Sequence, residues 1–83
     1  MNMNRTDALE RVRQALSSVI PDADVADLAP QDEFREALEM DSLDFLNFVE
    51  VLSERAGVRI DDEDASRLST LSACADFLIN RTQ

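Results

Sequence analysis

The sequence contains no histidine, lysine, tryptophan or tyrosine, and it has only one cysteine and one glycine. Without histidine, no nucleophile–base pair can be assembled, and a single glycine cannot form a glycine-rich phosphate loop, so the composition argues against an enzyme. One cysteine excludes a disulfide within the chain and is typical of a reducing compartment. Cys74 shares a predicted helix with Leu71 and Leu78, where we expect it to be a core residue.

Turn-forming residues and long apolar runs are also scarce. One glycine and two prolines favour long helices joined by few turns. The longest apolar runs, such as Phe77-Leu78-Ile79, are far too short to span a bilayer. The N-terminal Met1-Asn2-Met3-Asn4 lacks the apolar core of a signal peptide. With 83 residues, 45% of them apolar, we expect one folded domain over residues 1–83, monomeric, soluble and cytoplasmic.

Negative charge is abundant and concentrated in one part of the chain. The formal net charge is −10, and the stretch from Asp32 to Asp64 holds twelve acids and three arginines, so it carries nine of these charges. Such a stretch repels nucleic acid and anionic membranes and attracts basic protein surfaces. We therefore expect protein partners and no nucleic acid or membrane binding.

Hydrophobic spacing predicts the first helix and a long loop after it. Leu9, Val12, Leu16 and Val19 recur every three or four residues, which places a helix over residues 6–19. Asn4 or Thr6 can cap its start, and Pro21 closes it. Residues 21–38 should form a loop with a short helical turn near residues 33–37. Three apolar side chains should hold this loop to the core: Val25, Leu28 and Phe34.

Three further helices follow in the second half. Asp41 can cap a helix over residues 42–56, and Gly57 can end it. Its apolar stripe is wider than a core-facing helix needs, so Leu43 and Leu46 should face outward or line a cavity. A short helix over residues 62–68 and a last helix over residues 71–80, capped by Ser69 or Thr70, complete the chain. The predicted fold class is all-α: a four-helix bundle with three main helices and a short third one.

A serine at the start of helix 42–56 is the strongest functional signal. Ser42 follows a loop and stands at the positive end of the helix dipole, where a covalently attached phosphate is stabilised. Serine is common in the first turn of helices, however, and the chain has seven serines. Position alone therefore does not separate an attachment site from an ordinary helix start.

The surrounding residues resemble the acyl carrier protein family. The tetrad Asp41-Ser42-Leu43-Asp44 is similar to the attachment signature of that family, and residues 57–65 are similar to the connection between its second and third helices. Phe34, Leu38 and the final Phe77-Leu78-Ile79 also match, so the resemblance extends from about residue 34 to residue 79. It implies a four-helix carrier whose Ser42 receives 4′-phosphopantetheine from coenzyme A through a separate phosphopantetheinyl transferase.

The resemblance also implies roles for other residues. Asp41 and Leu43 would flank the attached arm, and the carrier would have no catalytic residue and no metal. Basic acyl-transferring and condensing enzymes would bind a partner face made of Leu43, Asp44, Leu46, Asn47, Glu50, Ser53 and Glu54. The acyl chain would enter a pocket lined by Phe34, Leu46, Val49, Leu52, Ile60, Ala65, Leu68 and Leu71, most of which would be core residues in any helical bundle.

Several positions depart from the family pattern. Glu39 stands three residues before the serine, where the family usually has glycine, so we expect a differently shaped loop, next to a bulkier Met40. Asn47 and Ser53 replace acids found in many fatty acid synthesis members, which favours a carrier dedicated to one pathway. Asp41 argues against a peptidyl carrier, in which histidine usually precedes the serine.

Two alternatives follow from the acids themselves. Asp22, Asp24 and the cluster 61–64 are similar to calcium ligands, but neither group is followed by the glycine and glutamate of an EF-hand loop. The main rival is an acidic helical module that binds a basic partner while Ser42 stays unmodified. The mass of the intact protein distinguishes this module from a carrier.

Overall fold

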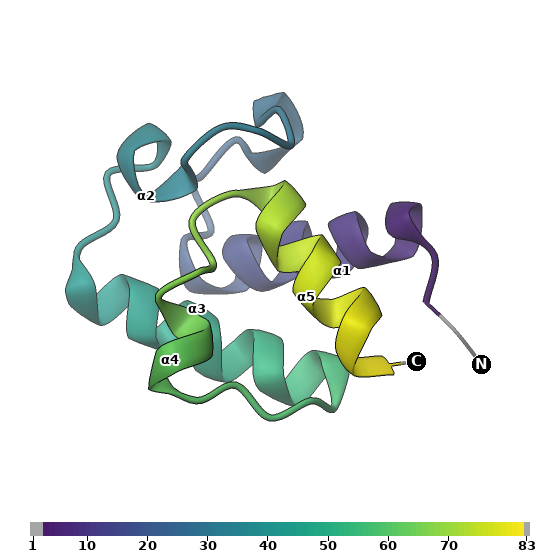
Figure 1. Cartoon of the computed structure of the whole chain (residues 1–83). Helices are drawn as coiled ribbons and strands as arrows, with labels where there is room; N and C mark the ends of the chain where they lie inside the picture. Colours follow the sequence, from purple (N-terminus) through teal and green to yellow (C-terminus); the bar gives the residue numbers. More distant parts are fainter. Residues whose placement is uncertain (1–2, 83) are drawn as a thin grey trace.

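Six helical segments make up most of the described chain, residues 3–82 of a computed structural model (Figure 1). Within these residues no strand forms, and a single isolated bridge joins Glu33 to Thr70. The all-α prediction is therefore confirmed. The segments are α1 (Arg5–Val19), η1 (Val25–Asp27), α2 (Phe34–Ala37), α3 (Ser42–Ala56), α4 (Asp62–Ala65) and α5 (Leu71–Thr82).

The three long helices α1, α3 and α5 enclose the core. Helix α1 packs against both α3 and α5, while α2 and η1 lie at one end of the bundle (Figure 1). The predicted α1 face is confirmed, since Val12 and Leu16 are fully buried, and Cys74 is fully buried on α5. Small residues on α1 allow this close packing, because Ala8 and Ala15 are also fully buried. The remaining fully buried large side chains are Phe34, Phe48, Leu52, Leu68, Leu71 and Leu78.

The ends of α1 and α3 follow their capping residues. The Asn4 side chain accepts a hydrogen bond from the backbone N–H of Asp7 at 2.8 Å, so Asn4 is the cap of α1. Gly57 ends α3 in the left-handed conformation, with φ of 67°, and its N–H and that of Val58 both reach the Ser53 carbonyl. These local signals placed both helices within one residue of their observed bounds.

The shorter elements differ from their predicted bounds. Helix α4 ends at Ala65 and not at residue 68, because the chain turns there to bury Leu68. Helix α5 continues to Thr82, whose hydroxyl donates to the Leu78 carbonyl at 2.9 Å, and the Thr70 hydroxyl caps its start. The turn η1 lies inside the predicted loop. Leu28 and Phe34 are buried beside it, as predicted, and Val25 is half-buried against the core.

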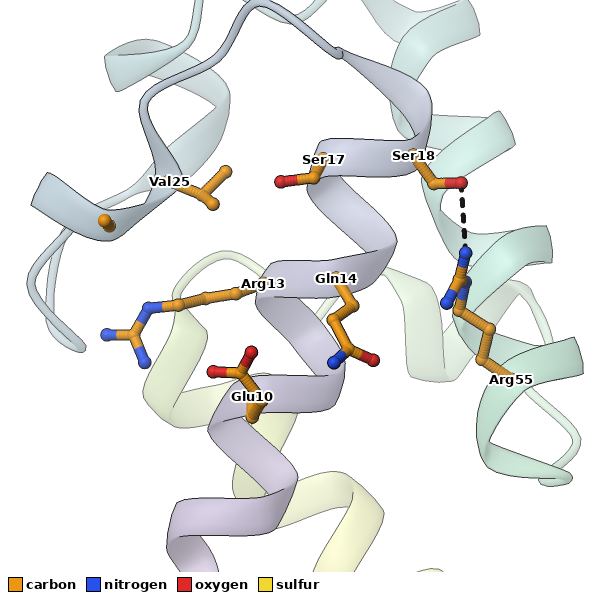
Figure 2. A pocket seen from close by; sticks show the side chains of 8 residues that line it. Glu10, Arg13, Gln14, Ser17, Ser18, Val25 and Arg55 are labelled. Carbon is orange, nitrogen blue, oxygen red and sulfur yellow. Dashed lines mark hydrogen bonds between the residues drawn. The ribbon is translucent and has the colours of Figure 1, made fainter.

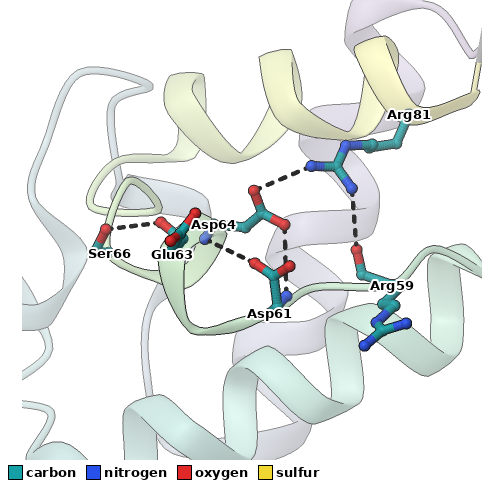
Figure 3. Close-up of polar contacts among 6 residues, drawn as sticks. All are labelled: Arg59, Asp61, Glu63, Asp64, Ser66 and Arg81. Carbon is teal, nitrogen blue, oxygen red and sulfur yellow. Dashed lines mark hydrogen bonds and ion pairs between the residues drawn. The ribbon is translucent and has the colours of Figure 1, made fainter.

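A polar network ties the short helix α4 to the end of α5 (Figure 3). Asp61 and Asp64 form a reciprocal capping box, and the hydrogen bond from the Asp64 N–H lowers the pKa of the Asp61 carboxyl. Arg81 donates to Asp64 Oδ1 at 3.0 Å and to the Arg59 carbonyl at 3.5 Å. A four-residue helix is not stable on its own. The ion pair between Arg81 and the largely buried Asp64 therefore helps to hold α4 in place.

The loop before α3 keeps the backbone shape that a glycine would favour. Glu39 adopts a φ of 54°, in the left-handed region that residues other than glycine usually avoid. The expected change of loop shape is therefore wrong at this residue, since Glu39 itself takes up the conformation. An L-residue in this region loses about 1–2 kcal/mol relative to the right-handed conformation.

We expect Glu39→Gly to stabilise the protein. Relief of the left-handed conformation outweighs the extra freedom of glycine in the unfolded chain, which leaves a gain of about 0.5–1 kcal/mol and a rise in Tm of about 3–6 °C. Glu39→Ala is the matched control, because it removes the same charge and keeps the unfavourable φ. Thermal unfolding of the three proteins tests this, and equal gains in both variants would assign the effect to charge.

Candidate functional site

Ser42 is the first residue of α3 and its side chain is exposed. The Asp41 carboxylate accepts a hydrogen bond from the backbone N–H of Asp44 at 2.8 Å, so the prediction that Asp41 caps this helix is confirmed. The N–H groups at the start of a helix have no acceptor within the helix. The position therefore combines an accessible hydroxyl with free backbone donors and the positive end of the helix dipole.

The loop that presents Ser42 is anchored on both sides. Met40 is buried, and its N–H donates to the Arg35 carbonyl at 2.8 Å. Beneath the loop three aromatic rings pack together: the Phe34 ring lies 5.1 Å from Phe48 and 6.4 Å from Phe45, measured between centroids. This aromatic cluster holds α2 against the start of α3, so the serine projects from a rigid base.

A guanidinium group covers the outer side of that cluster. The Arg35 side chain is exposed, and its Cζ lies 4.8 Å from the centroid of the Phe45 ring. A cation at this distance is attracted to the face of the ring. No periodic pattern in the sequence marks Arg35, although it is the lone basic residue between Arg13 and Arg55.

The site fits a phosphate attachment point better than a catalytic centre. A serine acts as a nucleophile only when a base accepts its proton, and the chain has no histidine to do so. An anionic group on the Ser42 oxygen would instead meet the N–H groups at the start of α3. The start of α3 therefore suits a phosphodiester on Ser42.

The predicted partner face lies along the outer surface of α3. Leu43 and Leu46 are 66% and 56% exposed, so these two leucines face outward. Asn47, Glu50 and Glu54 are exposed with them. Asp44 is half-buried, and the Ser53 hydroxyl donates to the Val58 carbonyl at 2.5 Å. Ser53 therefore helps to close the end of α3.

The predicted pocket residues do not all lie together. Phe34, Val49, Leu52, Leu68 and Leu71 are buried in the common core, and Ile60 and Ala65 are half-buried against it. The exposed Leu46 lies apart from this group, because its position on α3 places it with Leu43 on the outer side. The structure thus separates one predicted pocket residue from the other seven.

A surface pocket that sequence patterns did not indicate lies on α1 (Figure 2). Its volume is about 470 Å³, and its lining comes from α1, η1 and the end of α3: Glu10, Arg13, Gln14, Ser17, Ser18, Val25, Ala26 and Arg55. Arg55 donates to the Ser18 hydroxyl at 3.3 Å across one side of it. None of the predicted site residues lines this pocket, so it is separate from Ser42.

Residues 3–82 contain neither a metal-binding cluster nor a membrane-spanning helix. No three acidic or cysteine side chains in this part of the chain are placed to hold a metal ion. No helix among the same residues has both the length and the apolar character to cross a membrane.

Comparison with known proteins identifies a family. Residues 10–78 match the model of the phosphopantetheine attachment site family. The chain is 34% identical over 79 residues to an acyl carrier protein of Thermosynechococcus vestitus, covering 95% of this chain and 96% of the relative. It is 30% identical over 77 residues to an acyl carrier protein of Rubrobacter xylanophilus, covering 93% and 94%.

A solved structure supports the fold. The solution structure of a candidate acyl carrier protein from Anaplasma phagocytophilum superposes with a TM-score of 0.84 at 22% identity, covering 100% of this chain and 97% of that one. At this identity the likeness concerns the arrangement of the helices alone.

Proposed function

The chain belongs to the acyl carrier protein family of non-catalytic phosphopantetheine carriers, and on that basis we propose that Ser42 is its attachment residue. The observation that carries the proposal is the exposed hydroxyl of Ser42 at the capped start of α3, inside the matched segment 10–78. Asp41 holds the helix start in place, and Leu43 follows the serine on the outer side.

Loading would require a phosphopantetheinyl transferase, because carriers of this family are not catalysts. A P–O bond would form at the Ser42 oxygen and the pyrophosphate P–O bond of coenzyme A would break. Adenosine 3′,5′-bisphosphate would leave, and the hydroxyl proton would pass to a base of the transferase. When bound, the arm supplies a terminal thiol that carries acyl groups as thioesters. The role of the chain itself is to present the arm from a rigid helix start and to offer partners a recognisable surface.

We propose that enzymes with basic surfaces dock on the outer side of α3. The support is a pair of exposed leucines, Leu43 and Leu46, beside exposed carboxylates of Glu50 and Glu54. An apolar centre with charged edges is typical of protein interfaces. Expected partners are a phosphopantetheinyl transferase and the acyl-transferring and condensing enzymes of fatty acid or polyketide-type synthesis.

We propose that acyl cargo is sheltered between α3 and the segment that contains α4. Val49, Leu52, Leu68 and Leu71 are buried there, with Ile60 and Ala65 at the margin. Because these side chains form the core itself, the cargo would have to displace packed groups. A monomeric single domain in a reducing cytoplasmic compartment fits the buried free thiol of Cys74.

The attachment residue can be tested by mass. We expect a promiscuous phosphopantetheinyl transferase with coenzyme A to add one arm to the protein, and peptide mapping to place it on Ser42. Ser42→Ala should take up none. Serine substitutions elsewhere leave loading intact if the proposal holds, and Ser72→Ala is the matched control because its loss removes only a surface contact with Arg5.

The same experiment separates the carrier from the acidic module. A protein that stays unmodified under conditions that load another acyl carrier protein would support the module. Transfer that persists in Ser42→Ala would show that another hydroxyl is the attachment point.

A further inference from the structure

Arg35 is an isolated positive charge in the most acidic part of the molecule. It is the only basic residue between Arg13 and Arg55, and seven acids lie within nine residues of it: Asp27, Asp32, Glu33, Glu36, Glu39, Asp41 and Asp44. Yet within residues 3–82 the ion pairs formed are Arg5–Asp76 and Arg81–Asp64, and Arg35 takes part in neither. An exposed arginine here remains available to an anion that the chain itself does not supply.

Arg35 lies against the first turn of α3 through its contact with Phe45. Its guanidinium lies over the Phe45 ring, and Phe45 is three residues after Ser42 on α3. Residues three apart on a helix are surface neighbours, with Cβ atoms about 5–6 Å apart. Side chains on a helix also lean toward its N-terminus, so the Phe45 ring leans toward the turn that carries Ser42.

We propose that Arg35 is a positioning residue that pairs with the phosphodiester formed on Ser42. This inference rests on the proposed function, since it requires Ser42 to be loaded. The Phe45 ring holds one face of the planar guanidinium, while the N–H groups on its edge stay free for phosphate oxygens. The arm would then leave Ser42 on the side of α2.

A cavity lies on the same side. Arg35 and Met40 line a pocket of about 420 Å³ together with Glu33, Glu36 and Ser69. Because its other charged walls are acidic, the pocket repels the phosphate itself, which leaves Arg35 as the group that can hold the anion at the edge. The part of the arm beyond the phosphate is uncharged, so the acidic walls do not repel it.

The pairing matters because loading adds negative charge to an acidic surface. A phosphodiester is fully ionised at neutral pH, and it would join a stretch that already carries nine net negative charges. The α3 amides offset part of the repulsion. Arg35 would offset a further part of the repulsion between the phosphodiester and the acids. This contribution exists only in the loaded protein.

The test is a comparison of unloaded and loaded protein in two arginine variants. Arg35→Gln removes the charge beside Ser42. Arg59→Gln removes the same charge from an exposed site beyond the far end of α3, a helix about 22 Å long. Mass spectrometry first establishes complete loading of each protein, so the proposed function is judged before the inference. Thermal unfolding then gives the shift in Tm on loading for each variant.

We expect the shift on loading to be about 2–4 °C less favourable in Arg35→Gln than in the natural protein, and unchanged in Arg59→Gln. The difference should shrink at 0.5 M NaCl and be partly restored in Arg35→Lys. The phosphorus NMR signal of the loaded protein should move in Arg35→Gln alone. A purely structural role for Arg35 would lower the Tm of unloaded and loaded protein equally. Equal shifts on loading in all variants, with an unmoved phosphorus signal, would overturn the inference.

Discussion

Lysine in place of both Glu50 and Glu54 should slow association with a basic phosphopantetheinyl transferase by about tenfold or more at low ionic strength. Both carboxylates are exposed on α3, beside the outward-facing Leu46. The double change replaces two attractions with two repulsions on the face that the partner approaches. Rim charges act mainly on the encounter, so the dissociation rate should change little. Stopped-flow binding at several salt concentrations measures both rates.

A matched variant distinguishes the effect of charges on the α3 face from the effect of the net charge of the protein. Glu10→Lys with Asp22→Lys changes the net charge equally at exposed sites on α1 and the following loop. This control should lose far less of the association rate than the α3 variant. The loss in the α3 variant should also fade near 0.5 M NaCl, where the Debye length is only a few ångströms. Equal slowing by both variants would mean that overall charge, and not the α3 face, attracts the partner.

The elements that could be predicted from the sequence are those with local signals. Helices α1 and α3 have apolar residues at helical spacing and caps at both ends, and the structure uses Asn4, Asp41 and Gly57 in these roles. Ser42 was placed correctly at the start of α3 because a cap and a helix start are local features. The family resemblance then supplied its chemical meaning, which helix geometry alone could not.

The features that could not be predicted depend on contacts between distant residues. Arg81 and Asp64 are seventeen residues apart, and their ion pair sets where α4 lies. The turn η1 has no cap or periodic pattern of its own. Arg35 stands over Phe45 only because the aromatic cluster brings α2 against α3. Phe48 is buried and Leu46 is exposed, although both are apolar residues of α3. The difference depends on which side of α3 the other helices cover.

The absence of lysine, tyrosine and histidine makes one buried thiol decisive for alkaline stability. Burial raises the pKa of the Cys74 thiol well above its ordinary value of 9.0. The unfolded chain therefore loses this proton near pH 9, while the folded protein keeps it. Above pH 9 the folded state therefore binds more protons than the unfolded chain. The free energy of unfolding keeps its full value below pH 9 and falls as the pH rises from 9 toward the thiol pKa of the folded protein.

We expect the free energy of unfolding, roughly 5 kcal/mol in total, to fall as the pH rises above 9, by at most about 1.4 kcal/mol for each pH unit. Urea unfolding between pH 7 and pH 11 measures this loss. Cys74→Ala loses some stability at every pH through the smaller side chain, but its stability should stay level where that of the natural protein falls. Arginine keeps its charge throughout this range, so no other side chain can reproduce the slope. Parallel decline in the two proteins would show that repulsion among the acids, and not the thiol, limits alkaline stability.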